Sequence, residues 1–566
     1  MSEILPQRTK QEIEAQAAED WVPGTVHLVD VNHDLNVEHN GDSDVVLIPQ
    51  PSDDPNDPLR WSKAKKHWQF VILFYWSFLT SVATNWVGPA WDDWTVAFNT
   101  TYTVLNNTSA VGWCFLGIGC VVLQPIAMKF GRRGVYLFAT IVQTFGNVVG
   151  GTAHNVGALY GSNIMTCFAG APCDSLVQIS TTDIFFQHER ASKISLLTFA
   201  LYSGSFLGPV AAGYIVESQG WRWCYWYLVI FFGVLFAIQF FFMNDSTFAH
   251  KETDADEQDI IAQVISRESN VIEATGNIES EESESDKKVL DEKNVNVTDP
   301  EVNATQIPAE RTFVQRLKVI ETEYNDKRPF LVIFSRPLYA GLLPAILWGG
   351  LVYGVQVMWL SLIATTQSEF FSVAPYNFGP AAVGDTNFAS LIGCFFGTFW
   401  GGSLSDKFVA WMARRNNGIL EPEFRLWFIL LPAVINSSGL LMYGLGLNNG
   451  IHWILPGGFG MAFIGFGIGS AGALTLTYAL DCYPKMQSEG LVFMLFLRNM
   501  IGMGFTFAIQ PWLDTDGVVT TTWLMFMLSM IFNFSCLIFI KWGKYFRIKT
   551  KGIYLKFSDP NYSFAG

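Results

Sequence analysis

Two ionisable side chains interrupt stretches of sequence that otherwise favour a lipid environment. Asp174 follows the mostly apolar residues 156–173, and Arg498 lies within "VFMLFLRNMIGMG". A charge at the centre of a bilayer costs roughly 2.5–3.5 kcal/mol on insertion scales, so such groups usually face a hydrated cavity or a partner. A carboxylate at this depth could bind an ammonium group, take up a proton, or do each in turn.

Each of these two residues also has a purely structural interpretation. Asp174 could form a fixed hydrogen bond to a neighbouring helix, although the general behaviour of intramembrane ionisable groups favours a functional role. Arg498 would repel a cationic substrate, so its predicted role is gating or that of a counter-ion to Glu489, Asp481 or Asp174. A static ion pair is an equally good explanation of Arg498.

Several polar and aromatic residues could complete a site around Asp174. Aromatic faces attract amines by about 2 kcal/mol or more where water is excluded, and amides at membrane depth can hydrogen-bond a substrate. Each aromatic residue taken alone is also explained by packing or by an interfacial belt. The candidate substrate-binding residues are Asp174, Asp92, Trp86, Tyr202, Trp359, Gln356 and Gln178.

The composition predicts a single large membrane body. Half of the 566 residues are hydrophobic and only 15% are charged, against about 25% in ordinary soluble domains. The formal net charge of −15 arises mainly in residues 251–310, a Ser/Glu/Asn-rich stretch that reads as a disordered linker. The eight cysteines form no CxxC pair, which favours packing roles over disulfide or metal chemistry. No metal, cofactor, nucleic-acid partner or enzymatic activity is predicted.

Runs of about 20 apolar residues, the length needed to cross a bilayer, occur six times before the linker and six times after it. Lys and Arg concentrate in alternate connections, and this predicts cytosolic termini and a cytosolic linker. The predicted regions are an N-terminal cytosolic region (1–66), a six-helix half (67–243), the linker (244–336), a second six-helix half (337–543) and a cytosolic tail (544–566).

The predicted outer connections carry two glycosylation sequons and several acidic residues. The sequons begin at Asn99 and Asn106. The acidic residues would concentrate cations at the mouth of a cavity, although most of them could equally be solvated loop charges. Asp92, flanked by Trp91 and Trp94, is the strongest binding candidate among them.

The two halves echo each other in their loops. "TTDIFFQHER" and "ALDCYPKMQSEG" each place an Asp at the end of a span and a Glu before the next span. Related six-helix halves are how many secondary transporters are built, with the substrate between them. The glycines of "GSFLGPVAAG" allow either a hinge or a static packing seam. The candidate gating and coupling residues are Asp183, Glu189, Asp406, Arg414, Asp481, Glu489, Arg498, Gly208 and Pro209.

These motifs together resemble the major facilitator superfamily. "GSLSDK" at 402–407 with Arg414–Arg415 resembles its loop motif, and "GSFLGPVAAG" at 204–213 resembles the fifth-helix motif of its drug:proton antiporter branch. The chain departs from that pattern at Met128, where an Asp is usual, and at Thr166, where the branch carries an Arg. The resemblance implies an all-α membrane protein with twelve transmembrane helices in two pseudo-symmetric halves.

Longer strings are similar to the yeast plasma-membrane permeases for polyamines and histidinol. They are "VVLIPQPSDDPNDPLRWS" (45–62), "DIFFQH" (183–188), "RNNGILEPEFRL" (415–426) and "DCYPKMQSEG" (481–490). The resemblance implies proton-coupled uptake of organic cations, above all spermidine and putrescine, with partners limited to the substrate, protons and membrane lipid. A multidrug:proton antiporter that exports toxic compounds is the first alternative. A non-transporting nutrient sensor is the second.

Overall fold

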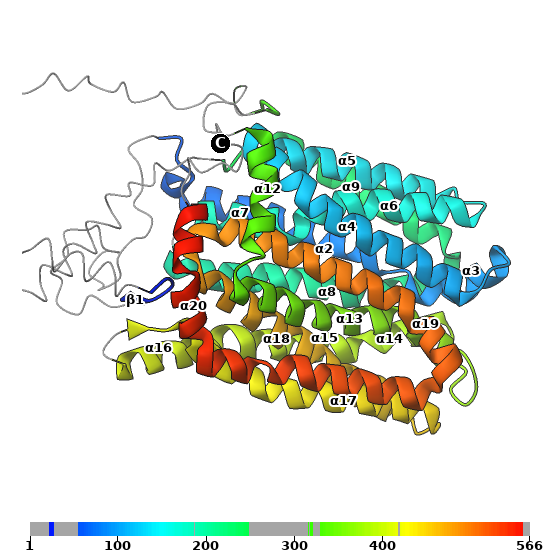
Figure 1. Ribbon diagram of the computed structural model, residues 1–566. Coiled ribbons are helices and arrows are strands. Elements are labelled where there is room, and N and C mark those ends of the chain that lie inside the picture. Colours follow the sequence, from blue (N-terminus) through cyan, green and yellow to red (C-terminus); the bar gives the residue numbers. More distant parts are fainter. Residues whose placement is uncertain are drawn as a thin grey trace, which may run out of the picture.

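The computed structural model describes residues 22–27, 55–185, 187–247, 315, 317–320, 329–416 and 419–558. Most of the predicted acidic linker therefore lies outside the described residues. The described residues form an elongated bundle of long helices, with the short ladder β1 (Val26–His27) and β2 (Ile419–Leu420) at one end (Figure 1).

The first half of the bundle contains six crossing segments. They are α2 (Lys63–Asn85), α4 (Tyr102–Phe130), α5 (Arg132–Gly151), α6 (Val156–Asp174) with α7 (Leu176–Ile184), α8 (Gln187–Gln219) and α9 (Arg222–Phe242). The short elements η2 (Gly88–Ala90) and α3 (Trp91–Ala97) join α2 to α4.

The second half also contains six crossings. They are α13 (Pro344–Phe371), α15 (Asn387–Phe399) with η3 (Trp400–Leu404) and α16 (Ser405–Arg415), α17 (Leu430–Asn448), α18 (Met461–Cys482) and the two arms of α19 (Gln487–Phe534). Gly517, at φ 75° and ψ 163°, interrupts α19, and the second arm returns along the bundle into α20 (Cys536–Ser558) (Figure 1). Shorter elements complete this half: α12 (Phe330–Ala340), α14 (Pro380–Asp385), η4 (Pro422–Ile429), η5 (Ile454–Gly460) and η6 (Pro484–Met486).

The twelve-crossing architecture agrees with the sequence-based expectation. Nine helical stretches of the described residues are long and apolar enough to span a membrane, and the one from Pro484 to Phe557 contains two crossings. The segments α5 and α6–α7, which are richer in Gly, Ser, Thr and Asn, complete the twelve.

The two ends of the bundle differ in charge. The basic end holds the start of α2 at Lys63 and the α4–α5 junction with Lys129 and Arg132, and the acidic end holds α3 with Asp92 and the end of α13 with Glu369. Figure 1 shows α3 at the opposite end from α7 and α20. The halves meet mainly where α4 packs on α19 and where α8 packs on α14 and α15.

Buried hydrogen bonds connect the first, third and sixth crossings within the first half. The Trp76 indole N–H donates to Thr140 Oγ1 over 3.0 Å, and the Thr140 hydroxyl donates to Gln239 Oε1 over 2.7 Å. All three side chains are fully buried. Since hydrocarbon offers polar groups no partners, these bonds hold α2, α5 and α9 in one arrangement.

The second half repeats this arrangement with different residues. Gln356 of α13 donates to Asn533 Oδ1 over 2.9 Å, and Asn436 of α17 donates to Gln356 Oε1 over 2.5 Å. These are again the first, third and sixth crossings of their half. Each half is therefore cross-linked internally by polar side chains at membrane depth.

Candidate functional site

A cavity lies between the two halves, in the part of the bundle nearer to the acidic end. Its empty volume, which includes space open to solvent, is about 940 Å³. Its wall comes mainly from α2, α4, α6, α8 and α13, with Arg498 contributed by α19. Many of the lining side chains carry hydroxyl or amide groups, among them Thr80, Ser81, Thr84, Asn85, Ser109 and Asn163.

Asp174 and Arg498 form a buried ion pair in the wall of this cavity. The Arg498 Nη2 donates to Asp174 Oδ2, and the two side chains are 6% and 4% exposed for Asp174 and Arg498 respectively. Of the three counter-ions considered for Arg498 from the sequence, the structure places Asp174 beside it. Because Asp174 belongs to the first half and Arg498 to the second, this pair bridges the two halves.

The helix break that presents Asp174 has a local cause. Pro172 within α6 has no N–H to donate. Three residues later the helix is interrupted at Ser175, which has φ −103° and ψ −57°. Asp174 is the last residue of α6 and is therefore at the break rather than in the middle of a regular helix. The apolar run before Asp174 predicted a continuous crossing through this region, so this break was not foreseen.

Arg498 has further partners on its own half. Its Nη1 donates to the Tyr353 hydroxyl over 3.0 Å, and its Nε donates to Asn499 Oδ1 over 3.1 Å. The guanidinium also lies 5.0 Å from the centre of the Tyr353 ring. In the part of the chain that the structure describes, Asp174 has Arg498 as its one partner. The pair is therefore asymmetric, because only Arg498 keeps other partners if the two separate.

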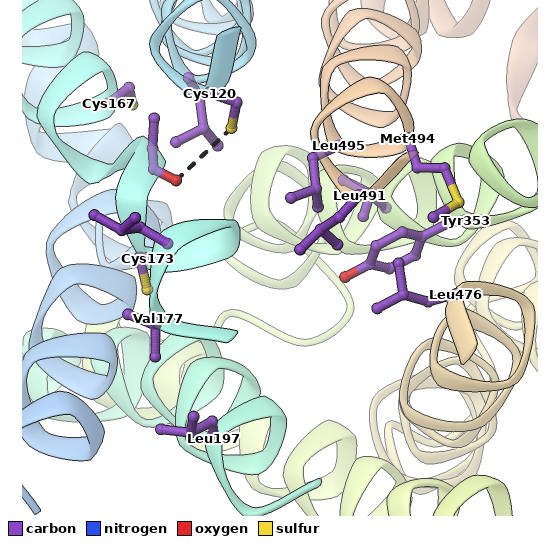
Figure 2. Close-up of a cluster of buried hydrophobic side chains, with 14 of the residues drawn as sticks. Cys120, Cys167, Cys173, Val177, Leu197, Tyr353, Leu476, Leu491, Met494 and Leu495 are labelled. Carbon is purple, nitrogen blue, oxygen red and sulfur yellow. Dashed lines mark hydrogen bonds between the residues drawn. The ribbon is translucent and has the colours of Figure 1, made fainter. Parts of the chain in front are cut away.

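Figure 2 shows how side chains from the two halves face each other near this pair. Cys120, Cys167 and Cys173 lie on one side, and Tyr353 points its hydroxyl toward them from the other side. The Cys120 thiol donates to the Ala171 carbonyl over 3.7 Å, which marks the close packing of α4 against α6. Tyr202 of α8 completes the polar group, since its hydroxyl donates to that of Tyr353 over 3.4 Å.

The structure brings two of the predicted substrate-binding residues, Asp174 and Tyr202, to the cavity wall. Three others lie elsewhere. Trp86 is buried against Trp94 and Tyr225. Trp359 packs on Phe505, and Gln356 belongs to the hydrogen-bonded core of the second half.

Asp92 and Gln178 lie at opposite ends of the region around the cavity. The Tyr102 hydroxyl donates to Asp92 at the acidic end, where the neighbouring Trp91 is part of the cavity wall. Gln178 is half-buried in α7, on the basic side of Asp174. Neither side chain lines the cavity in this conformation.

Predicted gating residues form ion pairs at the basic end. Asp183 pairs with Arg132, which joins α7 to α5. In the second half Arg425 pairs with Asp406 over 2.7 Å and with Asp481 over 3.5 Å. The two clusters occupy equivalent places in the two halves, as the loop echo in the sequence suggested.

The remaining gating candidates are more scattered. Glu489 pairs with Arg336 of α12 over 3.4 Å, while Arg414 is exposed on α16. Glu189 lies in the first turn of α8, where side chains are outside the described part of the chain. Sequence reasoning missed Arg336 and Arg425 as partners, although each is a lone cation beside a predicted span.

Gly208 and Pro209 lie where α8 meets its neighbours. A Cβ added at Gly208 would be 3.3 Å from the Val82 Cα of α2, in the same half. The Pro209 carbonyl faces the second half, where a Cβ added at Gly384 would be 2.7 Å from it. This arrangement is a close packing seam, and the hinge role remains a prediction.

The two predicted glycosylation sites differ in exposure. Asn99 is exposed after α3. Asn106 is 1% exposed, and its Nδ2, the atom that would carry a glycan, donates to Gln510 Oε1 over 3.1 Å. This packing leaves no room for a glycan on Asn106, because its amide joins α4 to α19.

Comparisons with known proteins place the chain among transporters. Residues 73–507 match the family model described as "Major Facilitator Superfamily". An uncharacterised MFS-type transporter of Schizosaccharomyces pombe is 34% identical, over 95% of this chain and 94% of its own. Protein HOL1 of Saccharomyces cerevisiae is 30% identical, over 95% and 97%.

Solved structures share the fold. A structure of the proton:xylose symporter XylE aligns with a TM-score of 0.57 at 12% identity, covering 85% of this chain and 97% of that chain. A POT family transporter in complex with 5-aminolevulinic acid aligns with a TM-score of 0.53 at 11% identity, covering 84% and 96%. At these identities the likeness concerns the fold alone.

Proposed function

Because the chain belongs to the Major Facilitator Superfamily and is a multi-pass membrane transporter, we propose that it is a proton-coupled carrier of organic cations. Polyamines such as spermidine and putrescine are the cargo we expect, on the resemblance of its longer motifs. The observation that carries this proposal is Asp174, a carboxylate in the wall of the central cavity whose one partner among the described residues is a cation from the opposite half.

Arg498 occupies the place that a substrate ammonium would take. An amine entering the cavity competes with the guanidinium for Asp174, and Tyr353 and Asn499 retain Arg498 when it is displaced. Since a buried charge without a partner costs several kcal/mol, these retained hydrogen bonds lower the cost of the exchange. Tyr202 and Trp113 in the cavity wall offer aromatic surface to an alkylammonium.

A proton can compete for the same carboxylate. Protonation of Asp174 removes the negative charge that holds Arg498 across the halves, whereas deprotonation restores it. A cation and a proton contend for this one group, so the binding of either favours the release of the other. In this scheme the Asp174–Arg498 ion pair forms when neither the substrate cation nor a proton is bound to Asp174.

The halves, residues 67–243 and 337–543, are proposed to rock about the cavity so that it opens to each side in turn. The polar cross-links within each half support movement as two bodies. The charge bias of the loops supports a cytosolic basic end and a plasma-membrane location with the acidic end outside. The acidic residues there would concentrate cations at the entrance.

The test is uptake of labelled spermidine, putrescine, histidinol and a cationic drug by cells that lack their own polyamine permease. Expression should raise spermidine uptake, and collapse of the proton gradient should abolish the increase. Asp174→Asn should lower uptake at least tenfold at equal surface expression. A variant that transports as well as the parent would refute the role given to Asp174.

The same cells separate the two alternatives. An exporter would lower the accumulation of toxic cations and protect the cells, whereas an importer would sensitise them. A nutrient sensor would signal without accumulation and would still signal with Asp174→Asn.

A further inference from the structure

The C-terminal part of α20 lies across the basic end of the bundle and is not a crossing segment. Figure 1 shows this red helix turning away from the direction of the second arm of α19. The predicted cytosolic tail starts at residue 544, and the helix continues through this segment to Ser558. Its two long faces have different surroundings.

One face of this helix is docked on the protein. Arg547 is fully buried and donates to both carboxylate oxygens of Glu423, over 2.9 and 2.7 Å. Farther along, the Tyr554 hydroxyl accepts the backbone N–H of Lys485 over 3.0 Å, and Phe557 stacks on Tyr339 at 5.1 Å between ring centres. These contacts fix the rotation of the helix about its own axis.

The opposite face carries an apolar stripe. Tyr545, Ile548 and Leu555 are 58%, 51% and 45% exposed. Their spacing of three and seven residues places them on one side of a helix. Trp542, which is 47% exposed, precedes Tyr545 by about one helical turn. It lies where α20 leaves the preceding crossing. Exposed apolar side chains that continue from a membrane-spanning segment are the pattern of an interfacial helix.

Lysines flank this stripe on both sides. Lys544 and Lys551 are seven residues apart and form one row, and Lys549 and Lys556 form the other. Lys549 and Lys541 are exposed, while Lys544 pairs with Glu421 over 2.7 Å. An apolar stripe between two rows of lysine matches the boundary between acyl chains and anionic headgroups.

From this arrangement we infer that the exposed face of α20, defined by Tyr545, Ile548, Leu555 and the flanking lysines, binds anionic phospholipid. The stripe enters the headgroup boundary and the lysines contact lipid phosphate and carboxylate groups. The inference rests on the proposed orientation, because anionic lipids concentrate in the cytoplasmic leaflet. Docking of the other face on η4 and α12 couples lipid binding to the second half of the transporter.

The chain itself offers a competing occupant of this face. Residues 251–310 contain 17 Asp and Glu against 5 Lys and Arg, so their charge is also complementary. Lipid is favoured because charge complementarity alone leaves the apolar stripe uncovered. The stripe also continues from the membrane-spanning arm of α19.

The test is spin-label EPR of the full chain in phosphatidylcholine vesicles that contain a trace of spin-labelled phosphatidylserine or phosphatidylcholine. The motionally restricted fraction gives the association of each lipid with the protein. A lysine near an anionic surface is worth about a factor of five in binding. We therefore expect a severalfold preference for phosphatidylserine that high salt lowers.

Matched variants locate the effect. The double variant Lys549→Gln/Lys556→Gln, which removes one of the two lysine rows, should lose much of the preference. Lys63→Gln/Lys407→Gln, which removes two exposed lysines from the same end, should keep it. Equal association of both lipids with the parent chain, or equal loss in both double variants, would overturn the inference.

Two further measurements separate this inference from its premises. If only a chain deleted of residues 251–310 prefers phosphatidylserine, then the acidic segment covers the face and the lipid inference is wrong. A C-terminal tag accessible from outside the cell would refute the orientation proposed with the function, but the EPR result stands independently of it. Transport without lipid preference would leave the proposed function intact and reject the lipid site.

Discussion

At the scale of single residues, the bridge between the halves consists of two opposite charges with unequal support. Asp174 has Arg498 as its one described partner, while Arg498 also binds Tyr353 and Asn499. Removing one member of a buried ion pair is strongly destabilising because the other charge is left uncompensated. Removing both members is often close to neutral.

This asymmetry predicts the behaviour of a double-variant series. Arg498→Gln should destabilise the protein by about 3–5 kcal/mol, because it leaves a buried carboxylate without a partner. Asp174→Asn/Arg498→Gln should return the stability to near that of the parent, yet it should not restore transport. Thermal unfolding in detergent and uptake assays measure the two properties separately.

Equal destabilisation in the single Arg498 variant and in the double variant would show that Arg498 acts through its own half rather than through Asp174. The double variant is also the control for misfolding. A folded, inactive double variant assigns the lost activity to the charges and not to the packing.

The sequence identified both charges but not their geometry. Asp174 and Arg498 could be found because a charge inside an apolar run is conspicuous. Gln356 was also conspicuous, yet it serves a core hydrogen-bond network. A polar residue in a crossing has the same sequence signal whether it faces a cavity or another helix, so rotation about the helix axis decides its role.

At the scale of elements, the polar cross-links hold three helices of each half together. In the second half Asn436 is fully buried and donates to Gln356, which in turn donates to Asn533. Interhelical hydrogen bonds in membranes are each worth about 0.6 kcal/mol on average and up to about 1.7 kcal/mol. Loss of the Asn436 amide breaks the first of these two bonds and leaves Gln356 Oε1 without that donor.

Asn436→Leu should therefore lower the stability of the protein by about 1–2 kcal/mol, with little change in the apparent affinity for substrate. Thermal unfolding and concentration-dependent uptake provide the two measurements. Ser438→Ala on the same helix is the matched control, because among the described residues its hydroxyl bonds the Ile435 carbonyl of its own helix and no other helix. If the Asn436 variant were as stable as this control, the hydrogen-bond network would not contribute to the stability of the protein.

The sequence predicts which segments are helical better than it predicts where a helix breaks or ends. Apolar runs of membrane length indicated the crossings, and the loop motifs indicated two related halves. The break after Asp174 and the continuation of α20 to Ser558 were missed. The break follows Pro172 in α6, whereas the path of α20 depends on tertiary contacts, such as the docking of Arg547 on Glu423, that local sequence does not specify.

At the scale of the whole molecule, the halves touch on both sides of the cavity. At the acidic end the Tyr214 hydroxyl donates to Asp385 over 3.0 Å, between α8 and α14. At the basic end Gln124 donates to Ser488 over 3.0 Å, between α4 and α19. Rocking of the halves must break one of these sets of contacts while the other remains.

A disulfide across the basic end should stop the cycle. A Cβ added at Gly402 lies 3.8 Å from the Ser195 Cβ, close to the mean separation in disulfides of about 3.8 Å. We expect Ser195→Cys/Gly402→Cys to lose transport on oxidation and to regain it with a reducing agent. Uptake before and after each treatment measures the effect.

The two single-cysteine variants, treated in the same way, control for oxidation of the eight native cysteines, all of which are free. Transport that continues in a fully cross-linked protein would mean that the basic end does not separate during the cycle. The alternating-access scheme would then fail at that end.

The neutrality of the central ion pair has an electrical consequence. With Asp174 and Arg498 paired, the empty carrier holds no net charge at its centre, so its return step should be insensitive to membrane voltage. A loaded step that moves one net elementary charge across the membrane gains about 2.3 kcal/mol per 100 mV. We therefore expect hyperpolarisation to accelerate inward movement of the cation-loaded form while leaving the unloaded return unchanged.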